Sequence, residues 1–109
     1  MRSFPTAIAL AILLPLAAGA ARAATPSMPP PAHLGLCAAC HGEHGRAQIP
    51  GAPNLGGQNL NYLRIALKHY RDGSRDVPVM RAAIGPLSDA ELDALARWYA
   101  AQPPVAGTP

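Results

Sequence analysis

Both cysteines of the chain lie within five consecutive residues, Cys37-Ala38-Ala39-Cys40-His41. This C-x-x-C-H pattern is the attachment signature of c-type haem. Two thiols three residues apart lie on one face of a helical turn, where they can add to the two vinyl groups of one porphyrin. The adjacent histidine can then bind the iron. The pattern therefore predicts one covalent haem c, held by Cys37 and Cys40, with His41 as the proximal iron ligand.

Three other interpretations of the two cysteines remain, and the surrounding sequence argues against each of them. A thioredoxin-like dithiol needs a βαβ context, and no segment alternates polar and apolar residues as a strand does. A zinc site would need a second C-x-x-C or a pair of histidines at zinc-finger spacing. A short disulfide would fit the spacing, but the five-residue signature is more specific for haem attachment.

The N-terminal region has the layout of a secretory signal peptide. Arg2 precedes an uncharged apolar run over residues 7–18, and small residues follow it up to Ala23. The run is shorter than the about 20 residues that a bilayer span needs. We therefore expect a signal peptide over residues 1–23, cut after Ala20 or Ala23, and a mature protein in the periplasm. Only a retained leader would attach the chain to a membrane.

Removal of the leader changes what the composition implies. The formal net charge falls from +3 to +1 because Arg2 and Arg22 are lost, and 86 of the 109 residues remain. Nucleic-acid binding would need a clustered basic face and is not expected. So small a domain can bury little surface, and two cysteines cannot supply the several disulfides of small secreted proteins. A large cofactor would complete the core.

The remaining sequence predicts an all-α domain with three main helices and long loops. Helical periodicity and end signals support this prediction: Gly73 is a helix stop, and Ser88 with Glu91 forms a capping box. The expected elements, in chain order, are a proline-rich tether over 24–31, a helix over 32–40, a loop over 42–58, a helix from a cap at Asn59 or Asn61 to Asp72, a loop over 74–79, one or two helical turns over 80–84, a helix from Ser88 that ends before Pro103, and a disordered tail over 103–109.

The sixth iron ligand decides what such a haem can do. The candidates are the methionines and histidines outside the motif, namely Met28, Met80, His33, His44 and His69. Met28 lies in the tether, too far from the haem. His33 and His44 are too close to His41 in sequence to reach the opposite face of the haem. His69 falls on the solvated side of its helix. Met80 follows His41 by 39 residues, in a loop behind Pro78. The chain can therefore wrap around the haem edge, and Met80 is the predicted distal ligand.

At this point an ordered set of motifs resembles class I cytochromes c of the small bacterial periplasmic mono-haem type, the c-553 and c-four subgroup. The motifs are Cys37–Gly42, Pro53–Leu55, Gly57-Gln58, Tyr62-Leu63, Tyr70–Gly73 with Arg75, Pro78–Met80, Leu87–Leu92 and Leu95–Ala100. The resemblance covers about residues 32–102. It implies the small cytochrome c fold, wrapped around one haem c that is attached through Cys37 and Cys40 and ligated by His41 and Met80.

The resemblance also implies roles for four further residues. The carbonyl of Pro53 would accept the Nδ1–H of His41 and thereby tune the iron. Trp98 and Tyr99 would pack the last helix against the first helix and the haem. Arg75 would either meet a haem propionate or be a solvated loop arginine.

The first helix departs from the family pattern. It is cut short by Pro29-Pro30-Pro31, and no aromatic residue precedes Cys37. Gly35 is expected to permit the close approach to the last helix instead. We therefore expect a weaker contact between the first and last helices than is usual in the family.

A haem ligated by histidine and methionine has no open position for a substrate, which leaves one-electron exchange. The expected function is a periplasmic one-electron carrier rather than an enzyme, because no other catalytic constellation occurs. One alternative is a dedicated haem c subunit of a periplasmic dehydrogenase complex. Another is a gas-binding haem protein with an open sixth position. The expected partners are redox proteins, namely a respiratory complex, a terminal oxidase or reductase, or a dehydrogenase, with the chain as a monomer or complex subunit.

Overall fold

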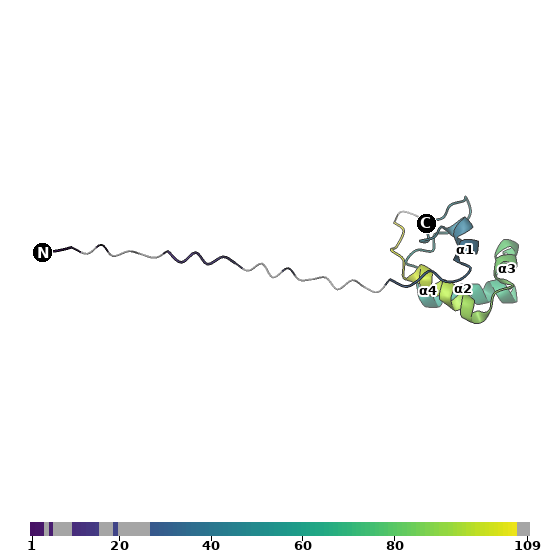
Figure 1. Ribbon diagram of the computed structural model, residues 1–109. Coiled ribbons are helices and arrows are strands. Elements are labelled where there is room, and N and C mark those ends of the chain that lie inside the picture. Colours follow the sequence, from purple (N-terminus) through teal and green to yellow (C-terminus); the bar gives the residue numbers. More distant parts are fainter. Residues whose placement is uncertain (4, 6–9, 16–18, 20–26, 107–109) are drawn as a thin grey trace.

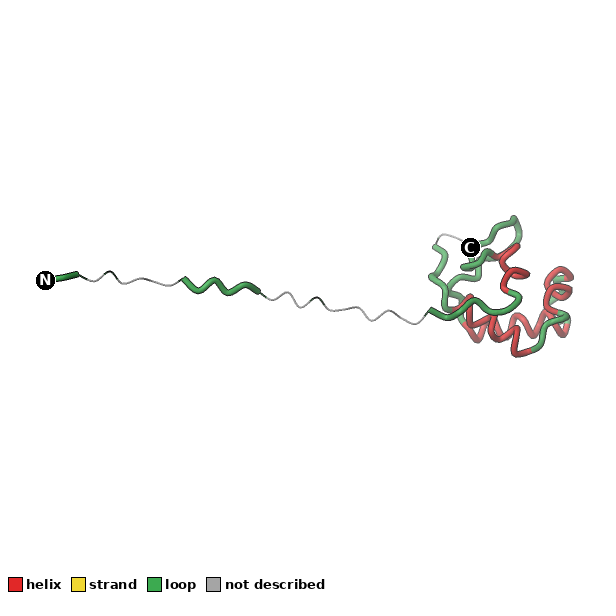
Figure 2. Tube along the Cα trace, in the orientation of Figure 1, coloured by secondary structure: helices red, strands yellow, loops and turns green. Residues whose placement is uncertain are grey.

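The computed structural model describes residues 1–3, 5, 10–15, 19 and 27–106. Within these residues it contains four helices and no strand, which confirms the predicted all-α class (Figures 1 and 2). The helices are α1 (Leu34–His41), α2 (Leu60–Asp72), α3 (Pro78–Ile84) and α4 (Asp89–Ala100). Helices α2 and α4 lie side by side, and α3 packs at one end of α2 (Figure 1).

The predicted signal peptide and the start of the tether lie largely outside the described residues, so this division of the chain stays a prediction. Among the described residues, no helix has both the length and the apolar character needed to cross a membrane. Residues 103–106, the described part of the expected tail, contain no helix. They lie against the loop between α1 and α2, since a Cβ at Gly56 would come within 2.8 Å of the Pro103 carbonyl oxygen.

Helix α2 begins and ends at the signals that its sequence predicts. The side chain of Asn59 accepts the backbone N–H of Tyr62 at 2.9 Å, which satisfies one of the free donors of the first turn. Gly73 ends the helix in the left-handed conformation, with φ of 81°. Leu63 and Ala66 are buried on the face that packs against α4.

Helix α4 begins at the predicted capping box. The Ser88 hydroxyl accepts the backbone N–H of Glu91 at 3.2 Å, and the Glu91 carboxylate accepts the backbone N–H of Ser88 at 2.8 Å. Leu87 and Leu92, the predicted hydrophobic staple, are both buried. The remaining buried residues of α4 are Leu95, Ala96, Trp98 and Tyr99. This helix therefore supplies half of the buried hydrophobic residues in the described part of the chain.

The predicted loop over 74–79 is wrong at its end, because α3 already begins at Pro78. Proline suits the first turn of a helix, where its missing N–H has no partner to lose, and here it continues the chain from the extended Val77. Met80 therefore lies in the first turn of a helix and not in a loop. The first helix also differs slightly, since it starts at Leu34 after His33, whose φ is 66°.

The expected role of Gly35 is wrong. Gly35 is exposed, and a Cβ added there would meet no atom within 4 Å, so no close approach depends on it. Helix α1 instead joins the core through buried Leu34 and half-buried Cys37 and Ala38. The extensive helix contacts in the described part of the chain are those of α2 with α4 and α3, and the expectation that α1 and α4 make a weaker contact than is usual in the family stays a prediction.

Candidate haem-binding site

Helix α1 carries the three residues of the haem motif. Cys37 and Cys40 are free thiols, and both are half-buried. Burial, and to a smaller degree the neighbouring Cys40, raises the pKa of the Cys37 thiol. This thiol therefore stays protonated at neutral pH, unlike the low-pKa thiolate of a dithiol redox centre. The pair has the spacing of a haem attachment site, and Cys37 lacks the lowered pKa of a thioredoxin-like thiol.

Among the described residues, His41 is the one buried polar side chain, with 7% of its surface exposed. Its Nδ1 lies 2.8 Å from the carbonyl oxygen of Pro53. A carbonyl can only accept, so Nδ1 must carry the proton and Nε2 must present its lone pair. This is the contact that the family resemblance implies. It leaves Nε2 as the nitrogen that can bind a metal and fixes the plane of the ring.

The loop over 42–58 is folded so that Pro53 returns to His41. Gly45, with φ of 86°, places its carbonyl oxygen 2.8 Å from the backbone nitrogen of Leu55 and 3.1 Å from that of Gly56. A side chain at Gly45 would clash with this contact, because its Cβ would lie 2.1 Å from the Gly56 nitrogen. The glycines of the loop therefore permit the close backbone packing that positions the Pro53 carbonyl.

The last helix holds the chain directly after the haem motif. Trp98 donates its indole N–H to the carbonyl of Glu43 at 2.6 Å, and Tyr99 donates its hydroxyl to the carbonyl of Gly42 at 2.9 Å. Burial raises the pKa of Tyr99, with smaller contributions from the charges of Cys37 and Glu43. Sequence reasoning predicted packing for both aromatics but missed these two bonds. The available signal was that buried Trp and Tyr need a partner for their polar end.

Met80, the predicted distal ligand, is half-buried and packs against the core cluster. It precedes the buried Ile84 by one helical turn, so the two side chains project from the same face of α3. Thus His41 and Met80 come from separate elements, α1 and α3, and both elements have residues that pack against the core cluster.

Two of the rejected ligand candidates have other partners. The Nε2 of His33 lies 3.0 Å from a carboxylate oxygen of Glu91. The Nδ1 of His44 lies 2.9 Å from the side-chain oxygen of Gln102, and its ring stacks on Trp98 with 6.0 Å between the ring centroids. The structure thus places both histidine side chains against α4 and the residues that follow it.

Arg75 is held against α2. Its guanidinium donates to the Tyr62 hydroxyl at 3.2 Å and lies over the rings of Tyr62 and Tyr70, 5.9 Å and 5.3 Å from their centroids. The hydrogen bond to Tyr62 is the main reason that the pKa of Arg75 is raised. Arg75 is therefore a cation anchored on two aromatic rings, and its contact with a propionate stays a prediction.

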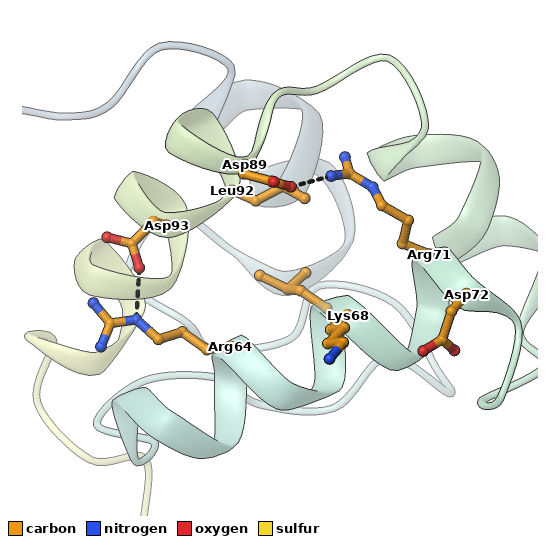
Figure 3. A pocket seen from close by; sticks show the side chains of 8 residues that line it. Arg64, Lys68, Arg71, Asp72, Asp89, Leu92 and Asp93 are labelled. Carbon is orange, nitrogen blue, oxygen red and sulfur yellow. Dashed lines mark hydrogen bonds and ion pairs between the residues drawn. The ribbon is translucent and has the colours of Figure 1, made fainter.

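A groove between α2 and α4 lies apart from these residues (Figure 3). Two ion pairs cross it: Arg64 to Asp93 at 2.6 Å and Arg71 to Asp89 at 2.5 Å. None of the residues of the haem motif lines this groove, nor does Met80. It is therefore a charged seam between two helices.

The residues present fit a covalent haem. Two free thiols at attachment spacing, a histidine with its Nε2 available, and a thioether on a separate helix are the donors that haem c uses. Among the described residues, no large side chain is completely buried. A large apolar group would supply the contacts that the protein itself does not make.

The helical fold and this donor set define a class I cytochrome c. Residues 33–98 match the family model described as cytochrome C oxidase, cbb3-type, subunit III, and this match covers more than half of the chain. The chain belongs to this family, and its cofactor is covalent haem c. The sequence contains the attachment motif once.

Similar proteins include several cytochromes. The chain is 36% identical over 84 residues to cytochrome c4 of Pseudomonas aeruginosa, with 77% of this chain and 42% of that protein covered. It is 39% identical over 70 residues to the thiosulfate dehydrogenase electron acceptor of Thiomonas intermedia, which covers 63% of this chain and 32% of that protein. The chain thus spans about a third to two fifths of these relatives. Their names describe cytochromes and an electron acceptor rather than enzymes, in agreement with the expectation from the sequence.

Proposed function

We propose that the protein is a periplasmic one-electron carrier, in which Cys37 and Cys40 bind the haem through thioethers and His41 and Met80 ligate its iron. The observation that carries the proposal is the 2.8 Å contact between His41 Nδ1 and the Pro53 carbonyl. It prepares His41 as a ligand with one available nitrogen and a fixed orientation. The bound haem supplies an iron that alternates between the ferrous and ferric states.

The surrounding residues suit this role because they restrain the proposed ligands. The Pro53 carbonyl increases the basicity of His41 and restrains its ring. Trp98 and Tyr99 restrain the backbone that leaves the motif. Met80 offers a neutral thioether, which favours the ferrous state over what a second histidine would give. With both ligands held by helices, little reorganisation opposes electron transfer.

A second candidate function rests on one comparison. A relative 39% identical to this chain is named as the electron acceptor of thiosulfate dehydrogenase. A dedicated haem c subunit that receives electrons from a periplasmic dehydrogenase is therefore the alternative. Purification distinguishes the two candidate functions. A free carrier purifies alone, whereas a haem c subunit purifies with its dehydrogenase at a fixed ratio.

The test is the absorption spectrum of protein expressed in a periplasm with its haem attached. We expect a methionine–iron charge-transfer band in the oxidised form and no change of the reduced spectrum with carbon monoxide. Met80→Ala should abolish the band, whereas Met28→Ala, in the expected tether, should leave it unchanged. A wild-type protein that binds carbon monoxide readily would refute ligation by Met80 and favour a gas-binding protein. Purification without covalent haem would contradict the assignment of Cys37 and Cys40.

A further inference from the structure

Arg71, in the last turn of α2, contacts both of the helices that follow it. Its Nη2 donates to the carbonyl oxygen of Ile84 at 3.2 Å and to that of Leu87. Its Nη1 donates to the carboxylate of Asp89 at 2.5 Å (Figure 3). Ile84 is the last residue of α3, and Asp89 is the first residue of α4. A single guanidinium thus joins the end of α2, the end of α3 and the start of α4.

The chemistry of these acceptors favours an arginine. The last carbonyls of a helix have no partner within the helix, and they carry the negative end of its dipole. The planar guanidinium has five donors in a fixed fork and can serve two carbonyls and a carboxylate together. A lysine ammonium would keep the charge but not this geometry. The Ile84 carbonyl already accepts the Leu87 backbone N–H at 3.0 Å, and Arg71 adds a second, charged donor to it from a neighbouring helix.

Apart from its packing against α2, few other polar contacts restrain α3. It is seven residues long, and its N-cap residue, Val77, has no side chain that could accept a hydrogen bond. The ion pair at its start, between Arg81 and Asp76, is 3.6 Å long and exposed. Its anchoring side chain is Ile84, which is 2% exposed and lies in the core. The bond from Arg71 acts on this same residue, at the end of the helix that enters the core.

We propose that Arg71 is a positioning residue for Met80. Met80 lies one turn before Ile84 on the same face of α3. A rotation of this helix end, or its displacement away from the core, therefore moves the Met80 thioether directly. By holding the Ile84 and Leu87 carbonyls, Arg71 keeps Met80 bound in competition with outside ligands. This inference rests on the proposed ligation by Met80, and it assigns the strength of that ligation to a residue outside the haem motif.

The chain contains a matched control. Arg64 lies seven residues earlier, on the same face of α2, and donates to Asp93 of α4 at 2.6 Å. It crosses the same groove with the same kind of ion pair, but its hydrogen bonds reach α4 and not α3 (Figure 3). A loss that is specific to Arg71 therefore reports on α3, whereas an equal loss in both variants reports on packing between α2 and α4.

The experiment measures the binding of imidazole to the oxidised haem protein, in which imidazole takes the place of the methionine sulfur on iron. In Arg71→Gln the methionine–iron charge-transfer band should weaken, and the affinity for imidazole should rise by about tenfold or more, because charge-assisted hydrogen bonds are lost. In Arg64→Gln the affinity should stay within about twofold of the wild type by the same reasoning. Guanidinium unfolding of both variants, followed by circular dichroism, separates ligand loss from global stability.

Three outcomes would decide against the proposal. Equal imidazole affinities in Arg71→Gln and the wild type would overturn it, and so would equal increases in Arg71→Gln and Arg64→Gln. A wild-type protein without the charge-transfer band would overturn ligation by Met80 itself, which is a separate and recognisable failure. If Arg71→Gln does not fold, Arg71→Lys and Arg64→Lys are compared in the same way, and a rise in affinity confined to Arg71→Lys supports the proposal.

Discussion

Replacing Gly45 by alanine is expected to destabilise the holoprotein by about 3 kcal/mol. The φ of Gly45 is 86°, where an L residue costs about 1 kcal/mol. Its new Cβ would lie 2.1 Å from the Gly56 nitrogen and 2.5 Å from the Gly56 Cα, so the two backbones must separate. Separation breaks the hydrogen bonds from Leu55 and Gly56 to the Gly45 carbonyl, at about 1 kcal/mol each.

Two other glycines provide graded controls. Gly51 also has a positive φ, 83°, but a Cβ there would meet no atom within 4 Å. Gly51→Ala should therefore cost only the conformational strain of about 1 kcal/mol. Gly35 lies in α1 with open space around it. Gly35→Ala should stabilise the protein by roughly 0.5–1 kcal/mol, because alanine is the better helix former.

The assay is guanidinium unfolding of the holoproteins, followed by far-ultraviolet circular dichroism. The reduction potential should move as well. Separation of the backbones at Gly45 displaces Pro53 and weakens its bond to His41, which makes the histidine a less basic ligand and raises the potential. A Gly45→Ala variant that loses no more stability than Gly51→Ala would refute the argument from the close backbone approach.

Three further predictions concern α4. Hydrogen bonds from Arg64 and Arg97 lower the pKa of Asp93 to about 2. The stabilising contribution of Asp93 is therefore complete above about pH 4 and is lost as the pH falls towards 2. In an acid titration followed by circular dichroism, Asp93→Asn should lose less stability over this range than the wild type, and an identical loss would contradict the pairing. Tyr99→Phe should lower the free energy of unfolding by about 1 kcal/mol through the lost hydroxyl donor, and an unchanged denaturation midpoint would show that this hydrogen bond adds nothing. Ser88→Ala should also cost about 1 kcal/mol by removing the N-cap, whereas a neutral result in thermal unfolding would mean that the packing of α4 does not depend on its cap.

The helix ends that the sequence predicts correctly depend on neighbouring residues. The cap at Asn59, the stop at Gly73 and the capping box of Ser88 and Glu91 each involve residues within a few positions of one another. A local pattern contains all the information for such contacts. The start of α3 was misplaced by two residues because Pro78 is compatible with both a loop and the first turn of a helix.

In the candidate site, too, some features could be predicted from the sequence and others could not. The haem motif could be predicted from residue types and spacing, and the contact of His41 with Pro53 could be inferred from family resemblance. Ligation by Met80 stays a prediction. The bonds of Trp98 and Tyr99 to the motif could not be predicted, because they join residues 55 and 57 positions apart. The role expected of Gly35 failed for the same reason, since the packing of α1 is decided by distant residues rather than by its own sequence.

The bonds between the haem-motif region and α4 also constrain the order in which the protein can form. Four hydrogen bonds, each spanning 55–58 residues, connect the two regions: His33 with Glu91, Gly42 with Tyr99, Glu43 with Trp98, and His44 with Gln102. The first of them cannot form until the chain has been synthesised through Glu91 and the last not before Gln102, and closing so large a loop delays them further. Both cysteines therefore lie on an open chain until these long-range bonds form, and a haem that reaches the thiols in that interval meets them before the last helix packs against the segment that follows them.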